Sequence, residues 1–149
     1  MLSTVINTCA FCKNERIYDH ETQQQALKIA FAVLKSFEND GFDSITSHTY
    51  SCLLKATRNL VPRCATRDDL VEGLFEKCKS KGIVDETIAK SMMEMCEESR
   101  IESMFGDAFA EEDISGQRHT GKRIIHLSKL PSEWTINTAQ DSKTTEQLI

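Results

Sequence analysis

Hydrophobic residues recur at helical spacing along most of this chain. The widest stripe lies between residues 26 and 37, where apolar side chains follow a period of 3.6 residues. Its members are Ala26, Leu27, Ile29, Ala30, Phe31, Val33, Leu34 and Phe37. A helix this apolar needs cover on two sides, so we expect it to lie between neighbouring helices. It should end at Asn39-Asp40-Gly41, where glycine can take the left-handed conformation that closes a helix.

Further stripes with the same period follow this helix. They consist of Tyr50, Leu53, Leu54, Thr57 and Leu60; of Leu70, Val71, Leu74, Phe75 and Cys78; of Ile88, Ala89, Met92, Met93 and Cys96; and of Ile101, Met104, Phe105, Ala108 and Phe109. Gly82 predicts the end of one helix. Thr66, followed by Asp69, predicts the start of another, and Asp85 predicts a third start. Because no useful alternating stretch precedes residue 113, these patterns predict an all-α body.

The helical pattern repeats with a period of about forty residues. The glycines that end two helices, Gly41 and Gly82, are 41 residues apart, and the pairs beginning at Leu53 and Met92 are 39 apart. Two helices in each period are typical of an α-solenoid, in which every helical pair packs on the next. An apolar run from Leu2 to Cys9 predicts a helix cut short at its start, so we expect the chain to belong to a longer protein.

Two segments carry a resemblance to a known family. Thr49-Tyr50-Ser51-Cys52-Leu53-Leu54 resembles the first helix of a pentatricopeptide repeat (PPR), and residues 71–83 resemble its second helix. Residues 3–10 and 25–42 resemble the preceding pair. The loops between paired helices are longer than usual, and residues 130–134 (Leu-Pro-Ser-Glu-Trp) are similar to a segment of divergent algal PPR proteins. The resemblance implies PPR-like repeats over residues 1–112, a C-terminal extension over residues 113–149, and a mitochondrial or plastid location.

The resemblance also implies a function, the binding of single-stranded RNA with one base read per repeat. The base-reading positions of the best repeat correspond to Ser51 and Asp85, and those of the upstream repeat to Ser3 and Thr46. A hydroxyl paired with a carboxylate is similar to the pairs that favour guanine. The alternative is that Ser51 is an ordinary exposed helix serine and that Asp85 only caps a helix.

Charge weighs against unaided RNA binding and keeps a second function open. The net charge is −5, and residues 1–112 carry 13 basic and 19 acidic side chains, whereas RNA affinity depends on cations that neutralise phosphates. Lys55 and Arg58 offer a local basic edge. A second basic segment, the basic arm, contains no acidic residue; its cations are Arg118, Lys122, Arg123 and Lys129. The weak alternation of residues 123–127 predicts either a short strand or an extended arm. The second function is therefore a structural or adaptor subunit that docks proteins.

Other classes of function have little support in the sequence. No phosphate-binding loop, nucleophile elbow or paired-carboxylate motif occurs, so we expect neither an enzyme nor a cofactor. Cys9 and Cys12, with His20 downstream, could form half of a zinc site, but no second half follows, and Cys9 falls on an apolar stripe. The longest apolar run, Ile29 to Leu34, is too short to cross a membrane. We expect Trp134 to anchor the extension on the last repeat.

Overall fold

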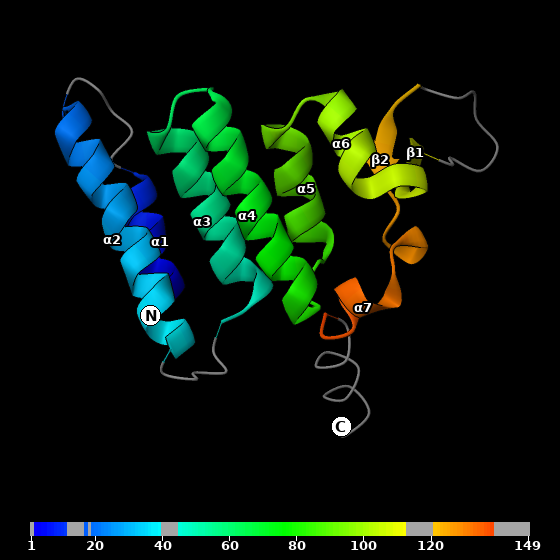
Figure 1. Ribbon diagram of the computed structural model, residues 1–149, viewed down its shortest axis with the longest axis horizontal. Coiled ribbons are helices and arrows are strands. Elements are labelled where there is room, and N and C mark those ends of the chain that lie inside the picture. Colours follow the sequence, from blue (N-terminus) through cyan, green and yellow to red (C-terminus); the bar gives the residue numbers. More distant parts are fainter. Residues whose placement is uncertain (1, 12–16, 18, 40–44, 113–120, 139–149) are drawn as a thin grey trace. The chain divides into compact units, whose positions relative to one another are not determined.

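The computed structural model describes residues 2–11, 17, 19–39, 45–112 and 121–138 (Figure 1). Within these residues the protein is mostly helical, as the periodicity predicts, with one small two-stranded sheet. The chain forms two compact units, Met1–Cys78 and Lys79–Ile149, and the boundary between them lies within one helix.

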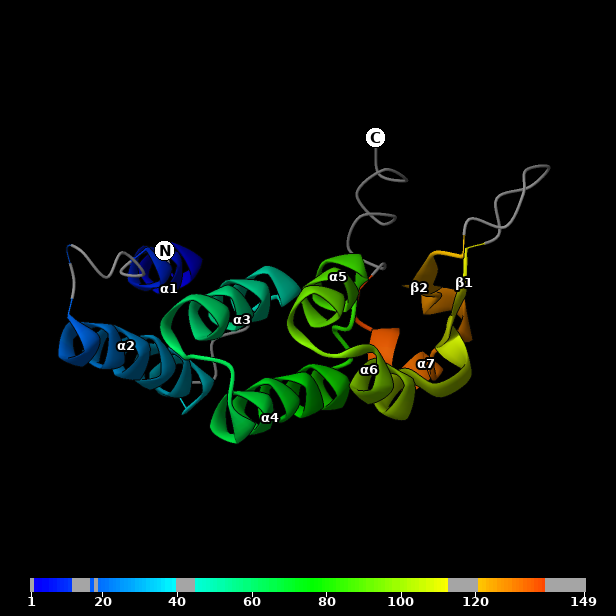
Figure 2. The same cartoon turned by 90° about the horizontal axis from the view of Figure 1, so that it is seen from above.

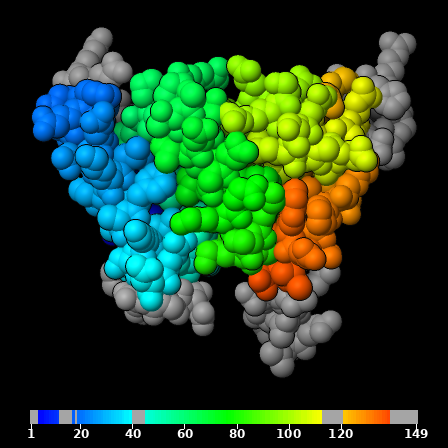
Figure 3. All heavy atoms as spheres, viewed as in Figure 1, coloured from blue at the N-terminus to red at the C-terminus, as the bar shows by residue number. Residues whose placement is uncertain are grey.

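The first unit consists of paired helices. They are α1 (Leu2–Ala10), α2 (His20–Asn39), α3 (Ser47–Leu60) and most of α4 (Ala65–Lys81). Figure 2 shows α1 beside α3 in one layer and α2 beside α4 in the other. In Figure 3 the spheres of α2 and α4 form the face toward the viewer. Helix α3 packs against both α1 and α2.

The position of α3 follows from its sequence. Its buried residues are Thr49, Tyr50, Cys52, Leu53, Leu54, Ala56, Thr57 and Leu60, so that most of its circumference is covered. The buried hydroxyl of Thr57 has a hydrogen-bond partner within the same helix, because its Oγ1 donates to the carbonyl oxygen of Leu53 at 2.9 Å. The wide stripe of α2 is only partly buried: Ala26, Ala30 and Leu34 are covered, while Ile29 remains half exposed.

The second unit combines helices with a short sheet. Helices α5 (Glu86–Met95) and α6 (Glu98–Phe105) lead through a 3₁₀ turn, Gly106–Ala108, into β1 (Phe109–Glu111). Strand β2 (Arg123–Ile125) pairs with β1 in antiparallel register, with Phe109 opposite Ile125. A second 3₁₀ turn, Leu127–Lys129, and the short helix α7 (Ser132–Thr135) follow.

Two local predictions are wrong, and each has a physical reason. The helix predicted to reach Phe109 ends at Phe105, because Gly106 takes a positive φ of 54° and turns the chain into β1. The helix predicted to start at Thr66 instead includes that residue: α4 begins at Ala65, because the backbone N–H of Asp68 already donates a helical hydrogen bond to the carbonyl oxygen of Cys64 at 3.2 Å. In contrast, Asp85 caps α5 as predicted, with Oδ1 accepting from the backbone N–H of Ile88 at 3.0 Å.

The strand predicted as one option within the basic arm is present as β2. Gly82 ends α4 with a φ of 67°, as the glycine predicts. Among the described helices, none combines the length and the apolar character that a membrane span requires.

Candidate nucleic-acid interface

The exposed side of α3 is a narrow polar stripe. Because eight of its residues are buried, the side chains left along one face include Ser51, Lys55 and Arg58. These positions are spaced by four and three residues and so lie above one another on the helix. We call them the α3 stripe. At 1.5 Å per residue the stripe is about 10 Å long. Ser51 is half-buried, whereas Lys55 and Arg58 are exposed.

Helix α1 extends this surface. Its exposed positions Thr4 and Thr8, together with Phe11 directly after the helix, have the same spacing, and the side chain of Phe11 is 60% exposed. The C-terminal ends of α1 and α3 are joined by a hydrogen bond from Asn59 Nδ2 to the carbonyl oxygen of Ala10, at 3.1 Å. This contact brings the end of α1 beside the last turns of α3.

One contact crosses from the α3 stripe to the end of α1. The ammonium of Lys55 lies 5.2 Å from the centroid of the Phe11 ring, within the range of a cation–π interaction. The surface formed by α1 and α3 therefore presents hydroxyl groups, two cations and an aromatic ring. We call it the α1/α3 face, defined by Thr4, Thr8, Phe11 and the α3 stripe.

The other predicted base-reading residues have different settings. The side chain of Ser3 lies outside the described residues, although its backbone belongs to α1. Thr46 is the N-cap residue of α3, and its backbone N–H donates to Thr49 Oγ1 at 3.4 Å. Asp85 caps α5 and belongs to the second unit, whereas Ser51 belongs to the first. The two residues of the best predicted base-reading pair therefore belong to different units.

A buried polar group supports α3 from inside the first unit. Tyr50, which is fully buried, donates a hydrogen bond from its hydroxyl to Glu38 Oε1 at 2.6 Å. The other carboxylate oxygen of Glu38 accepts from Lys77 Nζ at 3.1 Å. Burial, and secondly the bond to Glu38, raises the pKa of the Tyr50 hydroxyl well above its ordinary value. The neutral phenol is therefore the stable form.

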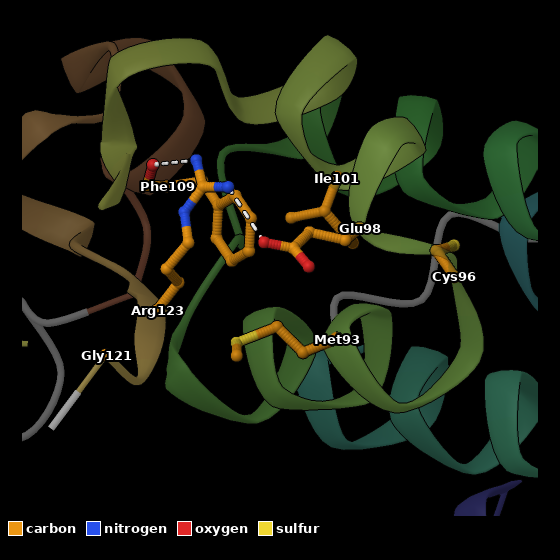
Figure 4. Close-up of a pocket in the computed structure, with 7 residues that line it drawn as sticks. All are labelled: Met93, Cys96, Glu98, Ile101, Phe109, Gly121 and Arg123. Atoms are coloured by element: carbon orange, nitrogen blue, oxygen red, sulfur yellow. Dashed lines mark hydrogen bonds and ion pairs between the residues drawn. The ribbon is translucent and has the colours of Figure 1, made fainter. Parts of the chain in front are cut away.

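The basic arm is not uniformly available for a ligand. Arg118 lies outside the described residues, and Lys122 and Lys129 are exposed. Arg123 instead points into the second unit, where Nη1 donates to Glu98 Oε1 at 2.8 Å and to Glu102 Oε1 (Figure 4 shows Glu98). Its guanidinium also lies 4.3 Å from the centroid of the Phe109 ring.

These contacts make Arg123 an internal clamp. The hydrogen bonds that it donates to Glu102 and Glu98 raise the pKa of its guanidinium still further, so that it stays charged. A cavity of about 220 Å³ lies beside it, lined also by Met93, Cys96 and Ile101 (Figure 4). Since Arg123 holds β2 against α6, we do not include it in the candidate interface.

A larger groove lies between α5 and β2 in the second unit. It has a volume of about 720 Å³. Apolar side chains, among them Ala89, Met93 and Ile124, contribute to its lining, together with the charged Lys90 and Glu94. This combination of apolar and charged groups suits a protein segment better than a phosphate chain.

The C-terminal extension folds back within the second unit. The carbonyl oxygen of Trp134 accepts from the backbone N–H of Val84 at 2.9 Å, and its ring packs edge-on against Phe105 with centroids 6.4 Å apart. The ammonium of Lys79 lies 4.6 Å from the Trp134 ring. Asn137 adds a hydrogen bond from Nδ2 to the carbonyl oxygen of Lys81 at 2.8 Å. Trp134 thus ties the extension to the end of α4.

The proposed half of a zinc site is only partly described. Cys12 lies outside the described residues, while Cys9 packs partly buried against a cluster of Ala10, Ala26, Ala56 and Leu60. Across the described part of the chain, no group of three or more His, Cys, Asp or Glu side chains is arranged to hold a metal ion. Burial raises the pKa of the Cys52 thiol, which keeps that thiol in its less reactive form.

Sequence reasoning did not single out Phe11 or Glu38. Phe11 falls on the side of its helix opposite the apolar run of Leu2, Ile6 and Cys9. A single apolar residue on a polar face is common and does not by itself mark a binding surface, so the sequence alone gives Phe11 no special role. Glu38 gave no signal either, since its partners Tyr50 and Lys77 lie in other helices.

Comparison with protein-family models, with curated proteins and with solved structures found no match to the chain.

Proposed function

We propose that the chain is a portion of a PPR-like α-solenoid that binds single-stranded RNA on the α1/α3 face. The packing in the first unit supports this proposal. Helices α1 and α3, the first members of two successive helical pairs, lie side by side, while α2 and α4 form the other layer (Figure 2). In an α-solenoid, corresponding helices of successive pairs line one continuous surface.

The single observation that carries the proposal is the composition of that surface. Although residues 1–112 are acidic overall, the α3 stripe presents Lys55 and Arg58 beside the hydroxyl of Ser51. Cations neutralise phosphates, and a hydroxyl can donate to or accept from a base edge. The net charge of the body therefore does not describe the charge of this face.

Base reading by Ser51 and Asp85 remains part of the proposal on the strength of the family resemblance. Asp85 already accepts a hydrogen bond from the backbone of Ile88 as a helix cap, so that its carboxylate has a structural role as well. For this reason the phosphate contacts of Lys55 and Arg58 are the first part to test. With two cations engaged, RNA affinity is weak and sensitive to salt.

The test is a titration of the 149-residue chain against a fluorescently labelled, unstructured RNA of about 12 nucleotides. Two phosphate contacts on a single strand predict a fall in affinity of about sevenfold between 50 and 200 mM salt. Binding that is absent at 50 mM salt, or equal at both salt concentrations, would contradict the proposal. The organellar location can be tested separately, by imaging a fluorescent fusion of the complete gene product.

The groove between α5 and β2 favours a second candidate function, that of an adaptor subunit. An apolar lining with a charged rim is typical of the surfaces on which proteins dock. Replacing the exposed Lys90 by Glu would reverse a charge on the rim of this groove, while the exposed Glu76→Lys change on α4 serves as a control outside it. If the adaptor function is correct, the first change, and not the second, removes partner proteins that copurify with the chain.

A further inference from the structure

The Phe11 side chain is placed where a nucleobase can stack on it. It is 60% exposed directly after the last residue of α1, and the hydrogen bond from Asn59 to Ala10 holds this end of α1 against α3. A single exposed aromatic residue is common on protein surfaces and means little alone. What distinguishes Phe11 is its surroundings, which include the Lys55 ammonium 5.2 Å from its ring centroid.

We infer that Phe11 and Lys55 form a stacking subsite for one base of single-stranded RNA, with Lys55 taking the phosphate of the same nucleotide. The inference rests on the proposed function and adds to it a subsite that does not depend on the identity of the base. Stacking on aromatic side chains is tolerant of sequence, because every base has a π-face.

The chemistry of the pair explains how the subsite would operate. Without RNA, the ammonium of Lys55 lies over the Phe11 ring, an interaction of modest strength at an exposed site. A base that covers the ring displaces the ammonium, and the flexible four-carbon stem of lysine lets it turn toward a nearby phosphate. The protein thus exchanges one weak internal contact for a stacking contact and an ion pair.

The rest of the face continues from this subsite. Arg58 follows Lys55 by three residues on the same side of α3, and Ser51 precedes it by four. A strand whose base stacks on Phe11 therefore extends in both directions from Lys55, with a phosphate at Arg58 on one side and a neighbouring base at Ser51 on the other. The subsite anchors the strand, and selectivity among bases depends on the hydroxyl of Ser51 farther along the stripe.

The experiment compares two labelled probes of equal length, decameric oligoadenylate and an abasic ribose-phosphate decamer. Both carry the same phosphates, but only the first has bases to stack. We expect the wild-type chain to bind oligoadenylate at least about fivefold more tightly than the abasic decamer, from the lower bound for base–aromatic stacking. Phe11→Ala should remove this preference, and Phe11→Tyr should retain it.

A matched control is Ile29→Ala, which removes another half-exposed apolar side chain, on α2 rather than on the α1/α3 face. It should leave both affinities unchanged, and thermal unfolding of each variant would verify folding. If Phe11→Ala binds oligoadenylate as tightly as the wild type, the stacking subsite is overturned while RNA binding stands. If the wild-type chain binds neither probe, the proposed function and the subsite both fail.

Discussion

The hydroxyl of Tyr50 donates a 2.6 Å hydrogen bond to the carboxylate of Glu38, and this bond joins α3 to α2. Lys77, on α4, donates to the second oxygen of the same carboxylate. Three helices therefore meet at one polar group, in which Tyr50 is fully buried and Lys77 is half exposed. The bond holds α3 in the orientation that presents the α3 stripe.

Tyr50→Phe should destabilise the first unit by removing this bond while preserving the ring. A hydrogen bond to a charged group contributes about 1.5 to 3 kcal/mol, and Glu38 would keep its ion pair with Lys77. Urea unfolding followed by circular dichroism measures the change. A difference below about 0.5 kcal/mol, the usual range of neutral surface changes, would show that the bond contributes little.

Alkaline pH should destabilise the wild-type protein more than the Tyr50→Phe variant. The pKa of Tyr50 is raised in the folded protein, whereas in the unfolded chain it is near its ordinary value of about 10. The folded state thus binds this proton more tightly, so stability is fully present below pH 10 and falls as the pH rises above it. The measurement is the unfolding midpoint between pH 8 and 11; parallel curves for the two proteins would refute the shift.

Gly82→Ala should loosen the C-terminal extension. An added Cβ at this position would lie 2.5 Å from Ile136 Cγ2 and 3.0 Å from the carbonyl oxygen of Glu133, on a backbone with φ of 67°. The left-handed conformation alone costs about 1 to 2 kcal/mol for a residue other than glycine. Because Trp134 is the one tryptophan in the sequence, its fluorescence reports the displacement.

Gly73→Ala provides the matched control for this change. Gly73 lies inside α4, and an added Cβ there would meet nothing within 4 Å. Alanine is the better helix former, so the variant should gain about 0.5 to 1 kcal/mol of stability and leave the Trp134 spectrum unchanged. Equal behaviour of the two variants would contradict the tight contact at Gly82.

Arg123→Gln should weaken the small sheet of the second unit. The change removes the ion pairs with Glu98 and Glu102 and the cation over the Phe109 ring. Hydrogen exchange should then accelerate at the backbone N–H of Glu112 and of His126, which bond across the two strands. Lys129→Gln, an exposed change outside the clamp, is the control. Unchanged exchange in the Arg123 variant would mean that the clamp does not hold β2.

The elements that could be predicted from the sequence are those whose signals are local. Helix α5 has a capping aspartate, Asp85, which predicts where the helix starts, and an apolar stripe with period 3.6, which predicts its buried face. Strand β1 could not be found this way. It has only three residues and directly follows the 3₁₀ turn that begins at Gly106. It also depends on pairing with β2, which begins only at Arg123 and so lies outside any local pattern.

The candidate site was predictable only in part for the same reason. The resemblance pointed to Ser51, which lies within a recognisable motif, and the pattern of charges pointed to Lys55 and Arg58 on the same helix. The role of Phe11 depends on a contact between α1 and α3 that no local pattern encodes. Likewise, Arg123 belongs to a basic run by sequence, yet its acidic partners lie on α6.

The central claim is that the cations of the α3 stripe bind RNA phosphates, and the salt dependence of RNA binding tests it most directly. We predict that Lys55→Gln with Arg58→Gln makes the negative slope of log affinity against log salt shallower by about 1.4, or 0.7 for each phosphate of a single strand that the variant no longer neutralises. Lys28→Gln with Lys35→Gln, two exposed cations on α2, should leave the slope unchanged. Equal slopes for the wild type and the α3 variant would contradict the claim.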